Sequence, residues 1–250
     1  MRFKSLGAGK TILLLHAFPL SNQLWKDLLP PPGYRLFLPD FPGFGDSPLP
    51  QGDTDFTRLS QALQTHLKAL KIDDRIILGG ISMGGYWALE YTRLFQDQVE
   101  KLILISTRAG VDSPEGRQNR LAMAEKVEQE GTREIVEAMV PGLLGKTTLD
   151  RQPDVVSILR QWIQAAPPSG VALAQRVMAG RRDQTDLLPA LRIPTLILAG
   201  QEDALIAPQE SQNMAEKIRD VRLKILGSTG HLLSLENPDQ FQAILNDFVQ

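Results

Sequence analysis

The sequence predicts an α/β fold with a mostly parallel central sheet flanked by helices and interrupted by a helical insertion. Three observations lead to this prediction. Short apolar runs bounded by turn residues recur along the 250-residue chain, helical patterns separate them, and one long segment carries helical patterns only. Alternating strands and helices are typical of a parallel sheet built with right-handed crossovers.

The apolar runs are mostly continuous, which indicates strands buried on both faces of the sheet. They are "TILLL" (11–15), "RLFL" (35–38), "RIIL" (75–78), "KLILI" (101–105), "PTLILA" (194–199) and "VRLKIL" (221–226). The last run alternates apolar and charged residues, so we expect it to form a half-exposed edge strand.

Helical periodicity lies between these runs. In residues 55–70, apolar side chains recur at steps of three and four, and residues 84–95, 208–218 and 238–249 have similar patterns. Pro208 and Pro238 suit first-turn positions, and Asn237 is a candidate N-cap.

Residues 107–190 contain no convincing strand pattern. Helices are expected from Ser113 through Val127 and over residues 132–139, 153–165 and 169–179, with glycine and proline residues between them. We therefore predict a core made of residues 1–106 and 191–250, and a helical cap of residues 107–190 packed over one end of the sheet. Ordinary crossover helices are the alternative.

Composition excludes several classes of function. The chain has no cysteine, which rules out disulfides, thiolate catalysis and cysteine zinc sites. A net charge of −2 gives no reason to expect nucleic acid or an anionic membrane as a partner. His and carboxylate residues show no metal-ligand spacing, so we expect neither a metal nor a cofactor.

The first 20 residues bear on localisation. Their continuous apolar core, residues 12–15, is shorter than the roughly 7–15 residues of a secretory h-region. No stretch approaches the roughly 18 apolar residues of a membrane span. We expect a cytoplasmic monomer or homodimer that acts on a small molecule.

A G-x-S-x-G motif at Gly80-Ile81-Ser82-Met83-Gly84 carries the main chemical signal. It follows the strand pattern "RIIL" and precedes the helical pattern "YWALEYTRLF", which is the strand–turn–helix context of a serine nucleophile. Side chains two residues either side of the serine would collide in so tight a turn, which favours glycine there. The alternative is a structural turn, or one that binds phosphate.

A serine needs a base to act as a nucleophile. The chain has three histidines, at positions 16, 66 and 231, and hydrolases with this motif place the histidine after the serine. Only His231 satisfies that order. It lies in a glycine-bearing loop after the last strand pattern, although a surface role in that loop is the alternative.

The third catalytic group is expected at a strand end before His231. Asp203 follows the strand "PTLILAG" at the carboxyl edge of the predicted sheet, with Glu202 and Asp112 as alternatives. Its role would be to orient the imidazole and stabilise its charged form.

The predicted oxyanion hole uses two backbone N–H groups. One belongs to Met83 at the start of the helix, and the other to Phe18 in the loop "HAFPL". Apolar side chains suggest a mainly hydrophobic substrate pocket, although plain core positions are the alternative. These candidate substrate-binding residues are Trp25, Phe44, Met123, Met139, Trp162, Val171 and Met178.

The segments "LLLHAFPL", "LPDFPGFGDSP", "GGISMGGYWAL", "LILAGQEDALIAP" and "GHLLSLENPDQF" together resemble the α/β-hydrolase superfamily over nearly the whole chain. "HAFPLSNQLW", "ISTRAGVDSPEGRQNR" and "GRRDQTDLLPAL" are most similar to the serine esterase branch near 3-oxoadipate enol-lactonases. The resemblance implies a Ser82–Asp203–His231 triad, a helical cap and hydrolysis of a carboxylic ester or lactone without a cofactor. Ile81, where many relatives carry histidine or glutamine, and Ala17, where glycine is common, depart from the pattern. The short N-terminus implies a first hairpin reduced to "RFKSL".

These observations predict a serine carboxylic ester hydrolase. Two alternatives stay open: a hydrolase that cleaves a carbon–carbon bond of a dicarbonyl with the same triad, and a receptor of this fold that binds a ligand without hydrolysing it.

Overall fold

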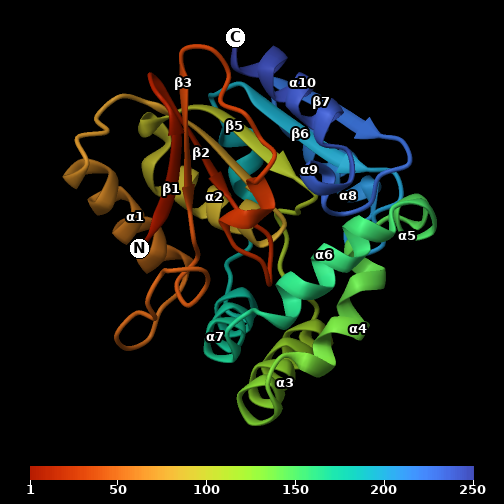
Figure 1. Cartoon of the computed structure of the whole chain (residues 1–250). Coiled ribbons are helices and arrows are strands. Elements are labelled where there is room, and N and C mark those ends of the chain that lie inside the picture. The colour runs from red at the N-terminus through yellow and green to blue at the C-terminus, as the bar shows by residue number, and fades with distance from the viewer.

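The computed structural model describes the backbone of residues 1–250 and every side chain except that of Glu134. Its centre is a seven-stranded sheet of order β1-β3-β2-β4-β5-β6-β7 (Figure 1). The strands are β1 (Phe3–Gly7), β2 (Lys10–Leu15), β3 (Tyr34–Pro39), β4 (Ile76–Ile81), β5 (Val99–Ile105), β6 (Thr195–Gly200) and β7 (Val221–Leu226). All neighbouring pairs are parallel except β1 with β3. This confirms the predicted fold class.

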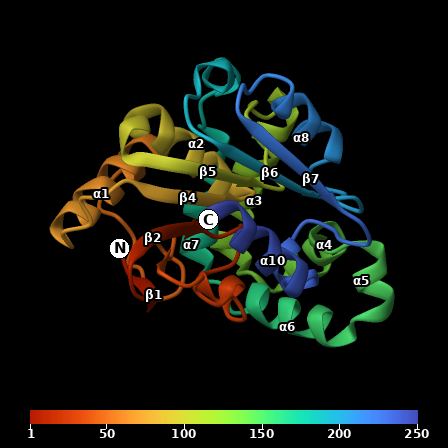
Figure 2. The same ribbon diagram turned by 90° about the horizontal axis from the view of Figure 1, so that it is seen from above.

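The helices of the core lie on both faces of the sheet. They are α1 (Phe56–Ala69), α2 (Met83–Phe95), α8 (Pro208–Ala215), α9 (Leu233–Glu236) and α10 (Pro238–Val249). Figure 2 shows α1, α2 and α8 on one face and α10 on the other. Burial on both sides explains the continuous apolar strands, since every residue of β4 and β6 is buried.

The two edges of the sheet differ. Strand β7 alternates between half-buried and exposed positions over most of its length, which confirms the predicted edge strand. Strand β1 runs antiparallel to β3, with Phe3 opposite Pro39 and Gly7 opposite Arg35. This short antiparallel strand agrees with the expected reduction of the first hairpin to "RFKSL", since β3 lies between β1 and β2 and these first two strands do not pair with each other.

The helices between β5 and β6 are α3 (Pro114–Glu130), α4 (Arg133–Leu143), α5 (Lys146–Arg151), α6 (Pro153–Gln164) and α7 (Pro168–Ala179). They group together at one side of the sheet (Figure 1). Within the described backbone, residues 107–190 form no strand. Helix α4 runs past Pro141 to Leu143, beyond the predicted end at residue 139. Proline lacks one N–H donor, which removes one helical hydrogen bond but still allows a last turn here. Helix α5 was not predicted.

Helix starts agree only in part with the predicted signals. Pro208 and Pro238 are first residues of α8 and α10, as expected. Asn237 occupies the position before α10, but its side-chain amide donates to the Gln240 side chain at 2.8 Å instead of capping the backbone. Asp55 caps α1 by accepting from the Arg58 N–H at 2.7 Å. Among helices of the described residues, none has the length together with the apolar content that a membrane crossing requires.

Helix α2 approaches the sheet so closely that glycine is required at its start. A Cβ atom on Gly84 would lie 2.2 Å from the carbonyl oxygen of Leu15 in β2. A Cβ atom on Gly80 would lie 2.1 Å from the carbonyl oxygen of Gly84. Since both obstacles are backbone atoms, a side chain at either position would force the helix and the strand apart.

We predict that Gly84→Ala lowers the free energy of unfolding by about 1–3 kcal/mol, the usual cost of overpacking a core. Gly110→Ala is the matched control, because a Cβ atom there meets nothing within 4 Å, and we expect it to change stability by no more than about 0.5 kcal/mol. Urea denaturation measures both. Equal stability of the two variants would contradict the close approach.

Candidate active site

Ser82 lies in a strained turn between β4 and α2. Its backbone adopts φ 54° and ψ −114°, a combination that residues with side chains rarely adopt. Its N–H donates to the carbonyl oxygen of Ile105 at 2.9 Å, and its carbonyl oxygen accepts from Thr107 Oγ1 at 2.9 Å. Ile105 at the end of β5 and Thr107 just after it therefore both hold the turn. The turn leaves the Ser82 side chain facing a cavity at the start of the helix.

His231 and Asp203 form a buried pair. The His231 Nδ1–H donates to Asp203 Oδ2 at 2.8 Å, and the two side chains are 1% and 0% exposed. The other carboxylate oxygen accepts from the N–H groups of Leu205 and Ile206, both at 2.9 Å. A carboxylate accepts only, so the imidazole carries its proton on Nδ1 and leaves the lone pair of Nε2 available. Nε2 is buried and has no hydrogen-bond partner among the described residues.

Both alternatives to Asp203 have other partners. Glu202 accepts from the backbone N–H and the hydroxyl of Thr147, each at 2.6 Å. Asp112 binds arginine side chains. Asp203 is thus the carboxylate that contacts His231.

A cavity of about 290 Å³ brings Ser82, His231 and Phe18 together from three distant segments of the chain. Its other lining residues are Tyr86, Arg108, Arg120, Met123, Ala138, Met139, Leu143, Gln175, Met178, Leu205 and Ile206. The insertion contributes Arg120 and Met123 from α3, Met139 from α4 and Met178 from α7. The cavity therefore lies between the carboxyl edge of the sheet and the inserted helices.

Of the two residues predicted to form the oxyanion hole, Met83 directly follows Ser82 and Phe18 lines the same cavity. Met83 is the first residue of α2, so its N–H has no acceptor within the helix. Phe18 lies in the loop after β2 and lines the cavity. A helix start and an adjacent loop are the usual sources of such donors.

The predicted pocket residues divide into two groups. Met123, Met139 and Met178 line the cavity, whereas Val171 is fully buried and does not. Trp25 also lies outside the cavity, because it is 1% exposed and stacks on Phe241 with ring centroids 6.0 Å apart.

Trp162 and Phe44 line a separate hollow beside residues 19–23. These two side chains therefore pack away from the cavity that Ser82 lines. An apolar side chain in the sequence does not by itself indicate whether it contacts substrate or packs elsewhere in the fold.

Sequence reasoning missed the polar end of the cavity, formed by Arg108, Arg120 and Gln175. The pocket is therefore less uniformly apolar than we predicted. Arg108 offered a usable signal, since it stands three residues beyond the end of β5 at the same sheet edge as Ser82. Arg120 offered none, because its approach depends on how α3 packs.

A family model described as the α/β hydrolase fold matches residues 10–238 of this chain. The chain belongs to the α/β hydrolase family. A solved esterase from Thermogutta terrifontis, in a malate-bound form, has 39% sequence identity and a TM-score of 0.95, covering 99% of this chain and 92% of that one. The family resemblance expected from the sequence is thereby confirmed.

Two further relatives of this α/β hydrolase have named activities. A pimeloyl-[acyl-carrier protein] methyl ester esterase of Neisseria meningitidis is 26% identical and covers 97% of this chain and 94% of its own length. An enol-lactonase from Burkholderia xenovorans shares the fold at a TM-score of 0.87 and 22% identity, over 99% of this chain and 95% of that one. The named relatives thus include esterases with sequence similarity to this chain and an enol-lactonase that shares its fold.

Within the described part of this hydrolase, no group of three or more His, Cys, Asp or Glu side chains is arranged to hold a metal ion.

His16 connects the loop that carries Phe18 to the segment after β3. Its Nδ1–H donates to the carbonyl oxygen of Ala17 at 2.9 Å, and its Nε2 accepts from the N–H of Phe41 at 2.9 Å. Burial lowers the pKa of His16 to about 4, against a hydrogen bond to Ala17 that acts to raise it. The imidazole is therefore neutral at pH 7, as both hydrogen bonds require.

Glu236 holds the loop around His231. Its Oε2 accepts from the N–H groups of Gly230 and Gly145 and from the hydroxyl of Thr148, and its Oε1 accepts from the N–H of Leu232, at 2.8–2.9 Å in each case. Glu236 is 5% exposed, so these bonds replace water. One carboxylate thus fixes the residues on both sides of His231 and ties them to α5.

We predict that Glu236→Gln destabilises the protein by about 1–3 kcal/mol, because an amide cannot accept all four hydrogen bonds. We also expect kcat to fall by roughly 10- to 100-fold as the imidazole loses its position. Thermal unfolding and ester turnover measure the two effects. Glu216→Gln, an exposed carboxylate at the end of α8, is the control, and indistinguishable variants would contradict this role.

The lowered pKa of His16 predicts acid sensitivity. The folded value is about 4 and the ordinary value 6.5, so the unfolded chain binds more protons between these values and stability falls as the pH drops through them. By pH 4, the loss from this group is on the order of 3 kcal/mol.

The measurement is urea denaturation of the parent and of His16→Gln between pH 7 and 4. Because glutamine does not titrate, we expect the variant to lose less stability over this range. Parallel pH profiles would show that His16 is not the source.

Proposed function

We propose that this protein is a serine hydrolase that cleaves a carboxylic ester or lactone through an acyl-enzyme. The observation that carries the proposal is the buried His231–Asp203 pair, whose available Nε2 belongs to a ring lining the same cavity as Ser82. Ser82 is the nucleophile, His231 the general base and Asp203 the residue that orients the imidazole. The esterases among the relatives support the same class of reaction.

In the first step, Ser82 Oγ attacks the ester carbonyl carbon while His231 Nε2 takes the hydroxyl proton. The carbonyl oxygen becomes an oxyanion, which the N–H groups of Met83 and Phe18 stabilise. As the carbon–oxygen bond of the alcohol breaks, His231 returns the proton to the leaving oxygen. In a lactone, the leaving alcohol stays attached to the acyl group.

In the second step, His231 takes a proton from a water molecule that attacks the acyl carbon. The second tetrahedral intermediate collapses, the proton passes to Ser82 Oγ, and the carboxylic acid is released. Asp203 stays ionised throughout and stabilises the imidazolium form of His231. Every proton and bond is accounted for by the triad and water, so the proposed cycle needs no cofactor.

The helices of residues 107–190 act in this proposal as a cap over the active site. They line one side of the cavity with residues of α3, α4 and α7, and so limit the size of the acyl group that reaches Ser82. Excluding water from this space strengthens the electrostatic interactions of the oxyanion hole.

The direct test is the hydrolysis of short 4-nitrophenyl esters by the parent and by Ser82→Ala. We expect the variant to lose about 10⁶-fold in kcat, because its residual rate comes only from binding and the oxyanion hole. Ser169→Ala, an exposed serine of α7, should retain the parent rate.

Equal ester rates in the parent and Ser82→Ala would refute the mechanism. A parent protein that hydrolyses 1,3-diketones but not esters would instead assign the carbon–carbon bond reaction to the same triad. Binding without turnover of either class would favour a receptor.

A further inference from the structure

The charged groups that line the catalytic cavity are unbalanced. Apart from His231, the charged lining residues are Arg108 and Arg120, and no carboxylate lines the cavity among the described residues. The side chains of Arg108 and Arg120 are 31% and 22% exposed, so water screens part of their charge, but positive charge in excess at a cavity still attracts an anionic ligand. Only a carboxylate behind the cavity wall would neutralise both arginines within the protein itself.

Asp112 is the carboxylate behind this wall, and Arg181 already pairs with it. The Arg181 Nη2–H donates to Asp112 Oδ1 at 3.0 Å, and its Nη1–H donates to Oδ2. Arg181 is 4% exposed in this pair. Burial acts to raise the pKa of Asp112, but hydrogen bonds from Arg181 and Arg120 outweigh it and hold that pKa well below its usual range. Asp112 is thus one full negative charge.

The same carboxylate also contacts the two cavity arginines. Arg108 Nη2–H donates to Asp112 Oδ1 at 2.6 Å, and Arg120 Nε–H donates to Oδ2 at 2.7 Å. Three guanidinium groups therefore share this carboxylate. Asp183 also interacts electrostatically with Arg181 but, among the described side chains, forms no hydrogen bond or ion pair with either cavity arginine, so positive charge is in excess at the cavity. Arg120 Nη2–H also donates to Asp112 Oδ1 at 3.5 Å, and its other contacts are with neutral groups, Gln175 Oε1 at 3.1 Å and Met178 Sδ at 3.4 Å.

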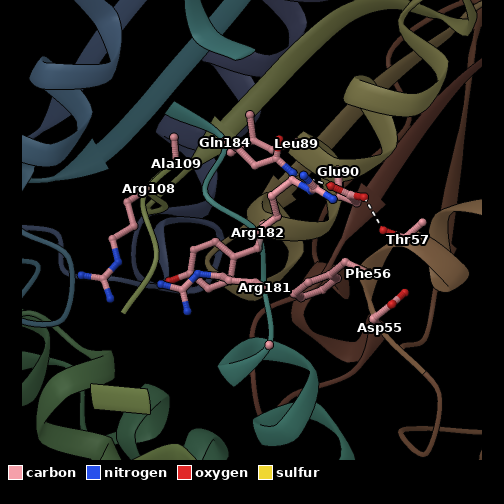
Figure 3. A pocket seen from close by; sticks show the side chains of 12 residues that line it. Asp55, Phe56, Thr57, Leu89, Glu90, Arg108, Ala109, Arg181, Arg182 and Gln184 are labelled. Carbon is pink, nitrogen blue, oxygen red and sulfur yellow. Dashed lines mark hydrogen bonds between the residues drawn. The ribbon is translucent and has the colours of Figure 1, made fainter. Parts of the chain in front are cut away.

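A second pocket, beyond Tyr86, does not supply the missing charge. Figure 3 shows Arg108 and Arg181 directed to the same side of this pocket, away from Glu90. Glu90 accepts from Arg93 Nε–H at 2.9 Å and also from Thr57 and Gln184. Arg93 neutralises the charge of Glu90. Glu90 is therefore not available to neutralise Arg108 or Arg120, whose positive charge remains in excess.

We propose that the substrate carries a carboxylate in addition to the ester or lactone that reacts, and that Arg108 and Arg120 bind this carboxylate. This inference rests on the proposed function of Ser82 and names its substrate class. Guanidinium forks match the two oxygens of a carboxylate. The three methionines of the cavity provide an apolar surface for the carbon chain that separates the two groups, and a cavity of about 290 Å³ suits a small molecule.

The test compares matched esters that differ only in charge. Mono-4-nitrophenyl adipate carries a terminal carboxylate, 4-nitrophenyl hexanoate is its neutral analogue, and the 6-aminohexanoate ester is cationic. A second series, 4-acetoxybenzoate against phenyl acetate, places the carboxylate on the alcohol side. We expect kcat/KM to favour the anionic ester by about 10- to 100-fold in one series, which identifies the side, and to disfavour the cationic ester.

Arg120→Gln should remove most of this preference, mainly through KM, because the ester still reacts at Ser82 but loses a charged hydrogen bond. Arg117→Gln is the matched control, since Arg117 is an exposed arginine on the same helix, outside the cavity lining. We expect it to keep the preference of the parent. Thermal unfolding checks that both variants are folded.

The ratio of kcat/KM between anionic and neutral esters tests the carboxylate site, whereas the rate with neutral esters tests the proposed function. Turnover of the neutral esters without any preference for a carboxylate in either series would overturn this inference and leave the proposed function intact. A preference that Arg120→Gln retains in full would also overturn it. Absence of turnover with every ester would refute the proposed function itself.

Discussion

The turn between β4 and α2 holds Ser82 in a backbone conformation that is unfavourable for a residue with a side chain, and the site depends on this constraint. The turn persists because the surrounding backbone fits around it. Gly80 and Gly84 allow β4, α2 and β2 to contact one another closely. Glycine is also required at position 85, because a Cβ atom there would lie 2.4 Å from the hydroxyl oxygen of Thr107. The packed surroundings hold the backbone of Ser82 in its unfavourable conformation, and the turn places the serine oxygen at the start of α2.

The rest of the site is assembled by parallel strands that end at the same edge. Ser82 follows β4, Asp203 follows β6 and His231 follows β7. One edge of the sheet therefore brings together three residues that are far apart in the sequence. Loops at such an edge need support to be precise. Glu236 supplies it around His231, and a neutral His16 supplies it around Phe18. In the proposed mechanism, both residues act through the loops they hold.

The sequence predicted what depends on local pattern or chain order. Continuous apolar runs identified the buried strands, and alternation identified β7 as an edge. The order of Ser82 and the three histidines left His231 as the candidate base, which the structure pairs with Asp203. It did not predict features that depend on packing between distant segments. The pairing of β1 with β3, the burial of Trp25 against Phe241 and the approach of Arg120 to the cavity require the tertiary structure. Buried carboxylates such as Glu236 and Asp112 belong to the same group, because their role is defined by partners far away in sequence.

The central claim is that folding makes one serine hydroxyl reactive by placing an imidazole and a carboxylate behind it. Reaction with a fluorophosphonate followed by mass spectrometry of the digested protein tests this claim directly, since the reagent modifies serines activated in this way. The account predicts a single modified peptide containing Ser82, and a strongly reduced rate of modification in His231→Gln. Modification at another residue, or an unchanged rate without the imidazole, would contradict it.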